Sequence, residues 1–394
     1  MPHRFSRVLR FSDHLSSLFQ LVNHRDLLSY YSAPFLAAIE AGARSIMCAY
    51  SGVMGAPACG SPLINKMLRD ALNWNGHVVS DCTALELMSD FKWDDCQPPY
   101  PPTTCKPYYF PGHNFTQGVI EATNVALASG TDTNCGPWYR MWLSTLLANG
   151  SVPTSAVDAS VTRVLRSHVM LGLLDPTGPS RPYSLLGAAD VDTPAHRQLA
   201  LDAARESLVL LKNTKNALPL PNQGRGVKIA FIGPHANATD ALLSNYHGEN
   251  HLVYKHSPLS AALTRGLDVT YVRGCNICDT PTPANFPCTT VHYNTSGIPD
   301  AAHAAAAADV AVLFIGSDQT TEAENFDRQN ITLAGVQEEL LTAVLAANPL
   351  TVVVFISGGI VSSPVAVEHA SAIIYAFYGG QFGGKLFSGK QNTS

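Results

Sequence analysis

Acidic side chains stand directly after two apolar segments that lie far apart in the sequence. Asp81 ends the run Gly76-His77-Val78-Val79-Ser80-Asp81. A second acidic cluster, residues 322–328, follows an apolar run that ends near residue 315. A carboxylate at the start of the loop after a strand is aimed by that strand, so both positions suit chemistry. Two carboxyl groups facing one sugar ring are what glycoside hydrolysis requires, which makes these segments candidates for one such site.

Composition excludes several classes of protein. The chain has 394 residues, 46% of them hydrophobic, and this predicts two domains with substantial cores. The net charge is -5 and no run of Lys or Arg is present, so neither a nucleic-acid nor a membrane partner is expected. No segment reaches the roughly 18 apolar residues of a membrane span. A charged fraction of only 14%, with abundant Gly and Pro, is typical of a compact, loop-rich enzyme.

Cysteines and glycosylation motifs favour an extracellular, secreted protein. The nine cysteines are accompanied by six Asn-x-Ser/Thr motifs. These motifs begin at Asn114, Asn149, Asn237, Asn294, Asn330 and Asn392. The first residues contain no signal peptide, because Asp13, His14 and Ser16 interrupt any apolar core. We therefore expect a secreted protein whose true N-terminus lies upstream of this sequence.

Helical and strand patterns alternate over the first half of the chain. Helices are predicted over residues 26–43, 62–74 and 116–128, with two more helices before residue 173. Strands are predicted over residues 45–49, up to Asp81, and into Asp132. This order is typical of a parallel α/β barrel, whose active residues lie at the carboxyl ends of its strands. Since a closed barrel has eight strands, residues 1–185 are predicted to be the C-terminal part of a TIM-like barrel.

The second half of the chain has the pattern of a layered α/β domain. Residues 186–226 are predicted to be a linker with one helix, residues 194–211. Near-continuous apolar strands then alternate with helices over residues 227–394, which predicts an α/β/α sandwich with a mainly parallel sheet. The strands are predicted over residues 227–233, 268–272, 309–315, 351–356 and 372–377, and the main helices over residues 299–308 and 335–347. No glycine fingerprint follows the first strand, so nucleotide binding is not expected.

A series of short motifs runs in order from about residue 26 to residue 389. They include Met47-Cys48-Ala49-Tyr50, Val78-Val79-Ser80-Asp81-Cys82, Ser129-Gly130-Thr131-Asp132, Ile232-Gly233-Pro234, residues 204–213, residues 318–328 and residues 379–384. Together they resemble glycoside hydrolase family 3, which implies an O-glycosyl hydrolase. The cysteine after Ser-Asp and the Asp-Gln-Thr-x-Glu-x-Glu pattern are more similar to the β-xylosidase branch than to the β-glucosidase branch. Compared with the family pattern, the chain is truncated at both ends.

The resemblance implies a retaining exo-glycosidase with an oligosaccharide substrate. Such an enzyme hydrolyses terminal β-D-xylosyl residues of xylo-oligosaccharides through a covalent glycosyl-enzyme, in xylan breakdown. By resemblance, Asp81 is the nucleophile, Glu324 is the acid/base and Tyr50 lines the sugar site. No metal and no cofactor are implied. Because a retaining pair stands about 5–5.5 Å apart, the expected site is a cleft formed where the two domains dock.

Each catalytic assignment has a structural alternative. Asp81 could instead cap a helix over residues 83–88, since Asp is a favoured N-cap residue. Glu324 could be a surface acid or form an ion pair with Arg328, four residues later. Glu322 is the second choice for the acid/base.

Structural roles are expected for several other residues. Instead of lining the sugar site, Tyr50 could be an aromatic residue buried in the barrel. Asp132 is expected to orient loops through hydrogen bonds. Disulfides are predicted between Cys48 and Cys59 and between Cys82 and Cys135, while one thiol stays unpaired among Cys275, Cys278 and Cys288. The pair Cys275-x-x-Cys278 lacks the second ligand pair of a zinc site.

Two further hypotheses for the function remain open. The first keeps the chemistry but changes the sugar, to β-glucosidase or α-L-arabinofuranosidase specificity. The second is a non-catalytic, truncated remnant that binds saccharide weakly, because an open half-barrel exposes a sheet edge and apolar faces. The sugar preference and the oligomeric state are not determined by the sequence.

Overall fold

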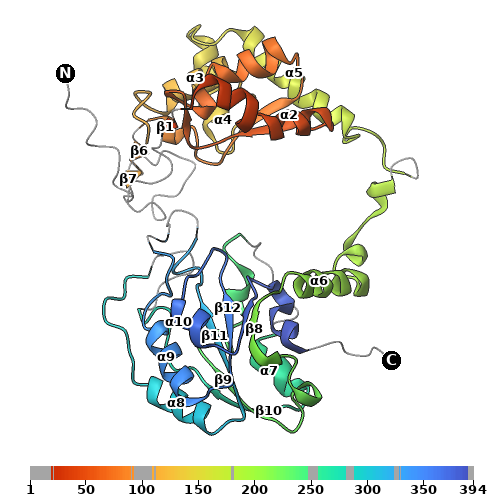
Figure 1. The fold of residues 1–394 in the computed structure, drawn as a ribbon. Coiled ribbons are helices and arrows are strands. Elements are labelled where there is room, and N and C mark those ends of the chain that lie inside the picture. Colours follow the sequence, from red (N-terminus) through yellow and green to blue (C-terminus); the bar gives the residue numbers. More distant parts are fainter. Residues whose placement is uncertain are drawn as a thin grey trace, which may run out of the picture. The chain divides into compact units, whose positions relative to one another are not determined.

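The computed structural model describes residues 19–20, 22–89, 91–92, 109–110, 112–178, 182–246, 256–280, 288–323, 328 and 330–388. The chain forms two compact units, Met1–Leu185 and Leu186–Ser394, and each is described here by itself (Figure 1). Among the described residues, no helix has both the length and the apolar character needed to cross a membrane.

The first unit is built around two parallel strands, β2 (Ser45–Cys48) and β5 (His77–Ser80). A parallel bridge between Val79 and Thr133 adds a third segment beside β5. Five α-helices of the described residues belong to this unit: α1 (His24–Asp26), α2 (Ala33–Glu40), α3 (Val119–Ser129), α4 (Trp138–Ala148) and α5 (Thr154–Met170). Its short strands are β1 (Phe19–Gln20), β3 (Gly52–Val53), β4 (Ala56–Pro57), β6 (Phe91–Lys92) and β7 (Tyr109–Phe110).

Two predictions for the first unit are corrected by the structure. The helix predicted over residues 26–43 is divided into α1, a π-helical turn (Leu27–Tyr31) and α2. Pro34 lies in the first turn of α2, where its missing N–H is tolerated, so the helix starts anew there. The strand predicted to run into Asp132 is only a bridge, because the N–H groups of Asp132 and Thr133 both donate to the carbonyl oxygen of Val78.

The second unit contains a six-stranded sheet in the order β10-β9-β11-β12-β13-β8. The strands are β8 (Val209–Asn213), β9 (Lys228–Ile232), β10 (Asp268–Val272), β11 (Val310–Gly316), β12 (Thr351–Ile356) and β13 (Ala372–Tyr375). All pairs are parallel except β13 with β8. Every residue of the central strands β11 and β12 is buried, as expected for a parallel sheet covered on both faces.

Helices cover the two faces of this sheet unequally. α8 (Ile298–Ala306), α9 (Gln337–Ala347) and α10 (Pro364–His369) pack on one face, around Leu313, Val353 and Phe355. α7 (Pro258–Thr264) packs on the other face, near Phe231 and Phe314. The short helices α7 and α10 were not predicted, although Ser257 and Ser363 cap their N-termini.

The predicted linker contributes a strand to the sheet. The helix predicted over residues 194–211 ends early, as α6 (Pro194–Glu206), and Val209–Asn213 form the edge strand β8. A short apolar run cannot be assigned to helix or strand by periodicity alone, which explains the error. Lys212 connects β8 to α10, since its Nζ donates to the carbonyl oxygens of Val367 and Glu368 at 2.7 and 3.1 Å.

Candidate active site

Asp81 lies directly beyond the carboxyl end of β5. β2 and β5 are in register with Cys48 beside Ser80, and the N–H of Asp81 donates to the carbonyl oxygen of Cys48 at 2.9 Å. On the other side of the strand, the N–H of Ser80 donates to the carbonyl oxygen of Thr133 at 2.9 Å. The backbone that carries Asp81 is therefore held from both sides, at the strand end where α/β barrels place their catalytic groups.

The carboxylate of Asp81 is not a helix cap. A capping oxygen accepts from an N–H two or three residues later, whereas Oδ1 of Asp81 accepts from the next residue, Cys82, at 2.8 Å. The helix predicted over residues 83–88 is only a 3₁₀ turn, Glu86–Met88, and Thr83 has a φ of 70°. Within the described residues, Oδ2 of Asp81 has no hydrogen-bond partner and the residue is only partly buried. One carboxylate oxygen is thus available to a substrate.

Tyr50 reaches the same edge of the first unit from β2. It lies two residues past the end of β2, and its carbonyl oxygen is 2.7 Å from Nε2 of His113. The side chain is partly buried against the hydrophobic cluster that contains Cys48 and Leu85. Because β2 and β5 are parallel neighbours, Tyr50 and Asp81 both follow the carboxyl ends of these strands. Part of the Tyr50 side chain also packs against the hydrophobic core of the first unit.

Disulfides border the strand ends that carry Asp81 and Tyr50. Both predicted pairs are confirmed, Cys48 with Cys59 and Cys82 with Cys135. The second pair joins the residue after Asp81 to the segment that follows Thr133, so it ties together the loops after β5 and its neighbour. These covalent links limit how far the loops beside Asp81 can move.

In the second unit one thiol remains unpaired, as predicted. Cys278 and Cys288 form a disulfide, and Cys275 is a buried free cysteine among the described residues. Burial raises the pKa of the Cys275 thiol to about 12, which leaves it unreactive at neutral pH. The cysteines Cys96 and Cys105 lie outside the described residues.

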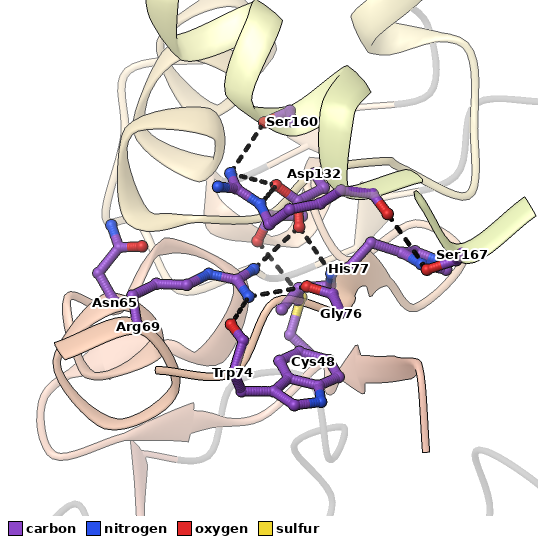
Figure 2. A network of polar contacts seen from close by, with 12 residues as sticks. Cys48, Asn65, Arg69, Trp74, Gly76, His77, Asp132, Ser160 and Ser167 are labelled. Atoms are coloured by element: carbon purple, nitrogen blue, oxygen red, sulfur yellow. Dashed lines mark hydrogen bonds and ion pairs between the residues drawn. The ribbon is translucent and has the colours of Figure 1, made fainter. Parts of the chain in front are cut away.

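Asp132 has the structural role that the sequence predicted (Figure 2). Its Oδ1 accepts from Nε and Nη2 of Arg163 at 2.8 and 2.6 Å, and its Oδ2 accepts from Nη2 of Arg69 at 3.0 Å. The same Oδ2 accepts from the backbone N–H of Val78 in β5 at 2.8 Å. With its side chain 0% exposed, Asp132 has no access to a substrate. It instead joins α5 and the π-helical turn of residues 65–71 to β5, the strand that precedes Asp81.

Glu86, which the sequence did not single out, is buried five residues after Asp81. The residue is 5% exposed, and within the described part of the chain its Oε2 meets no hydrogen-bond donor. Burial raises the pKa of its carboxyl above the ordinary value, while a hydrogen bond from Trp138 partly opposes this. No periodicity marks such a residue, because its burial depends on the packing of loops.

The raised pKa of Glu86 predicts a pH-dependent gain in stability for Glu86→Gln. The unfolded chain ionises this carboxyl near pH 4.3, at roughly its reference pKa, whereas the folded chain resists ionisation. The wild-type protein therefore loses stability as the pH rises through the unfolded value towards the folded one. We expect Glu86→Gln to unfold at a higher temperature than wild type at pH 7 to 8, with the difference shrinking towards pH 3. Thermal unfolding over this pH range measures it.

The matched control for this experiment is Glu40→Gln, which changes an exposed glutamate at the end of α2 in the same unit. It should shift the unfolding temperature by a similar small amount at all pH values. A Glu86→Gln effect that is the same at pH 3 and pH 8 would show that the carboxyl titrates normally.

In the second unit, the segment after β11 holds the second group of acidic residues. Glu324 lies outside the described residues, so its predicted role stays a prediction. The second choice, Glu322, has a side chain only 16% exposed and a carboxylate surrounded by donors. The donors are Oγ of Ser357, the N–H groups of Gly358 and Gly359, Oη of Tyr378 and Nε of Arg328. A carboxylate that accepts from so many groups is poorly placed to protonate a leaving group.

The comparisons with known proteins identify the family. Residues 13–167 match the family model of the glycosyl hydrolase family 3 N-terminal domain, and residues 208–389 match that of the family 3 C-terminal domain. The chain belongs to glycoside hydrolase family 3. This confirms the resemblance seen in the motifs, and with it the predicted fold class of a TIM-like barrel part followed by an α/β sandwich.

Several curated relatives are named as xylosidases. The probable exo-1,4-beta-xylosidase xlnD of Neosartorya fischeri is 36% identical over 371 residues. The beta-xylosidase/alpha-L-arabinofuranosidase 1 of Medicago sativa subsp. varia is 30% identical over 370 residues. Each alignment covers 92% of this chain and 43% of the relative. The chain thus spans less than half the length of the curated relatives it matches.

Solved structures of glycosidases share the fold. A GH3 exo-beta-xylosidase (XlnD) in complex with a xylobiose aziridine activity-based probe has a TM-score of 0.78 and 30% identity, covering 95% of this chain and 44% of that one. A β-glucosidase from Erythrobacter marinus has a TM-score of 0.72 and 27% identity, covering 91% of this chain and 46% of that one. The structural neighbours of this chain therefore include enzymes named for two different sugars.

Proposed function

We propose that this chain is a retaining exo-glycosidase of the β-xylosidase type, which removes terminal β-D-xylosyl residues from xylo-oligosaccharides. The observation that carries the proposal is that Oδ2 of Asp81, just beyond the carboxyl end of β5 in a family 3 chain, accepts no hydrogen bond from the residues that the structure describes. The relatives at 30% identity or more that are named as β-xylosidases support this sugar class.

The proposed reaction proceeds through two displacements at the anomeric carbon. Asp81, ionised, attacks this carbon through its unbound oxygen while the other oxygen keeps the hydrogen bond from Cys82. Glu324 donates its proton to the departing glycosidic oxygen, and the product is an ester between the sugar and Asp81. Glu324 then takes a proton from water, which attacks the anomeric carbon, breaks the ester and returns Asp81 as a carboxylate.

Secretion and glycosylation belong to the same proposal. Five of the six Asn-x-Ser/Thr motifs begin at an asparagine that is exposed in the described residues: Asn114, Asn149, Asn237, Asn294 and Asn330. Exposure is required for attachment of a glycan, and the disulfides favour an oxidising compartment. A secreted enzyme of this kind would act in xylan breakdown outside the cell.

Two alternatives are kept because particular relatives favour them. A named beta-xylosidase/alpha-L-arabinofuranosidase supports a second pentose, and a β-glucosidase among the solved structures supports glucose.

The test combines turnover with covalent labelling of the full chain. The protein, folded with its disulfides, is incubated separately with aryl β-xyloside, aryl β-glucoside and aryl α-arabinofuranoside. A xylose-configured aziridine probe is then added, and the labelled peptide is identified by mass spectrometry. We expect the xyloside to react fastest and the label to lie on Asp81. A folded sample that neither turns over nor takes up the label would reject the proposed activity of this chain, and preference for another sugar would change the assigned specificity.

A further inference from the structure

A cavity lies on the less covered face of the six-stranded sheet in the second unit. This is the face on which α7 packs, whereas α8, α9 and α10 pack on the other. Beside α7, residues 218–220 run against the sheet without helical structure. Such a segment fills less space than a helix, whose diameter with side chains is about 10–12 Å. A cavity of about 280 Å³ therefore remains between this segment, the end of α7 and the sheet.

The inner wall of the cavity is apolar and deeply buried. Phe231 of β9, Phe314 of β11 and Val354 of β12 belong to this wall, and each is at most 5% exposed. The rings of Phe231 and Phe314 lie with their centroids 4.9 Å apart and their planes tilted by 58°. Leu218 and Leu220 line the opposite side. The space equals that of about nine water molecules, but water would find few hydrogen-bond partners there. An apolar molecule suits it better.

Polar side chains line the cavity only where it meets solvent. They are Gln223, which is exposed, and Arg265, which is partly buried and follows the last residue of α7. Nη2 of Arg265 donates to Oε1 of Gln223 at 3.1 Å. Within the described part of the chain, no carboxylate forms an ion pair with Arg265, so its positive charge is matched only by a neutral amide. A carboxylate accepts from a guanidinium more strongly than an amide does.

We propose that this cavity binds a small aromatic carboxylate. Its ring would lie against Phe231 and Phe314, where a further ring can pack edge-to-face. Its carboxylate would replace Oε1 of Gln223 as the acceptor for Arg265. The apolar inner wall and the single uncompensated cation at the mouth match the two ends of such a molecule. The site consists of residues of the second unit alone, so it is independent of the proposed glycoside hydrolysis.

The test is isothermal titration calorimetry of the full chain with three probes. They are 3-phenylpropionate, which has both the ring and the charge, 3-phenylpropanol, which has only the ring, and propionate, which has only the charge. We expect 3-phenylpropionate to bind with a negative heat-capacity change, the mark of buried apolar surface. The alcohol should bind about tenfold more weakly, because it lacks the charge-assisted hydrogen bonds. Propionate should give no measurable binding at the same concentrations, because it buries little apolar surface.

Two results of the titrations would overturn the proposal. If 3-phenylpropionate does not bind, the cavity is not a site for this class of ligand. If propionate binds as tightly as 3-phenylpropionate, the apolar wall takes no part in binding.

Replacing Arg265 with glutamine tests the role of the charge at the mouth. Arg265→Gln should weaken the binding of 3-phenylpropionate about tenfold and leave the binding of 3-phenylpropanol unchanged. The matched control is Arg225→Gln, which removes an exposed guanidinium of the same unit that does not line the cavity. It should bind both probes like wild type. Undiminished binding of 3-phenylpropionate to Arg265→Gln would overturn the proposed pairing with Arg265.

The position of the probe is measured in the wild-type chain, so this part needs no substitution. With labelled methyl groups, nuclear Overhauser effects should connect the ring of 3-phenylpropionate to Val312, Val352 and Val354, which line the cavity on β11 and β12. The methyl groups of Val353, which pack on the opposite face of the sheet, serve as the reference and should show none. Contacts confined to methyl groups outside the cavity would reject the site even if the probe binds.

Discussion

Replacing Asp81 with asparagine is expected to lower kcat/KM for an aryl β-xyloside by at least about 10³-fold, with no change in the fold. Removing the nucleophile of another well-studied hydrolase lowers kcat about 10⁶-fold, which sets the scale. The variant should remain folded because, among the described residues, the carboxylate accepts a hydrogen bond only from the N–H of Cys82, and an amide oxygen can accept it equally well. Initial rates and thermal unfolding of wild type and Asp81→Asn measure the two parts of the prediction.

The control for this variant is Asp158→Asn, an equal change at an exposed position of α5 that should leave activity intact. Chemical rescue separates a nucleophile from a group that only binds. In Asp81→Gly, azide can enter the vacated space and attack the anomeric carbon once, so the product should be a glycosyl azide of inverted configuration. Wild-type activity that survives Asp81→Asn within about tenfold would reject Asp81 as the nucleophile.

Replacing Asp132 with alanine is expected to destabilise the first unit by about 3–5 kcal/mol, the loss typical of breaking a buried ion pair from one side. The change would leave the guanidinium groups of Arg69 and Arg163 without their shared partner, and the N–H of Val78 without its acceptor. Arg69 is already affected by burial, which lowers its pKa, while Asp132 opposes that shift. Total stabilities of about 5–15 kcal/mol make this loss large enough to unfold much of the unit.

Urea unfolding followed by near-ultraviolet circular dichroism measures this loss in the full chain. The second unit, whose sheet shares none of these contacts, provides an internal reference in the same sample. Asp132→Asn keeps an acceptor oxygen and should be destabilised less than the alanine variant. A variant that stays fully folded but loses turnover would mean that Asp132 has a direct part in the chemistry, which its burial argues against.

Much of the fold could be predicted because single short segments of the sequence carry the pattern of the strand or helix that they form. The strands β9, β11, β12 and β13 are apolar runs, and a strand buried on both faces needs such a run whatever its neighbours are. Asp81 could be placed at a strand end for the same reason. β8 could not be predicted, since Val209–Asn213 became a strand only through antiparallel pairing with β13. Likewise Pro34, which restarts a helix, was visible in the sequence, but the π-helical turn before it was not.

The features of the candidate site likewise fall into two groups, those that the sequence could predict and those that it could not. The sequence by itself determined the family and the strand-end position of Asp81, because these are encoded in short contiguous motifs. It predicted the cysteine pairs beside Asp81, which the structure then confirmed. Only the tertiary structure decided that Asp132 is enclosed by Arg69 and Arg163, that Glu86 is buried, and that Glu322 is surrounded by donors rather than free. The physical reason is that burial and charge pairing depend on groups brought together from distant parts of the chain. An acidic residue has the same one-letter identity whether it attacks a sugar, caps a loop or neutralises two arginines, and its surroundings determine which of these it does.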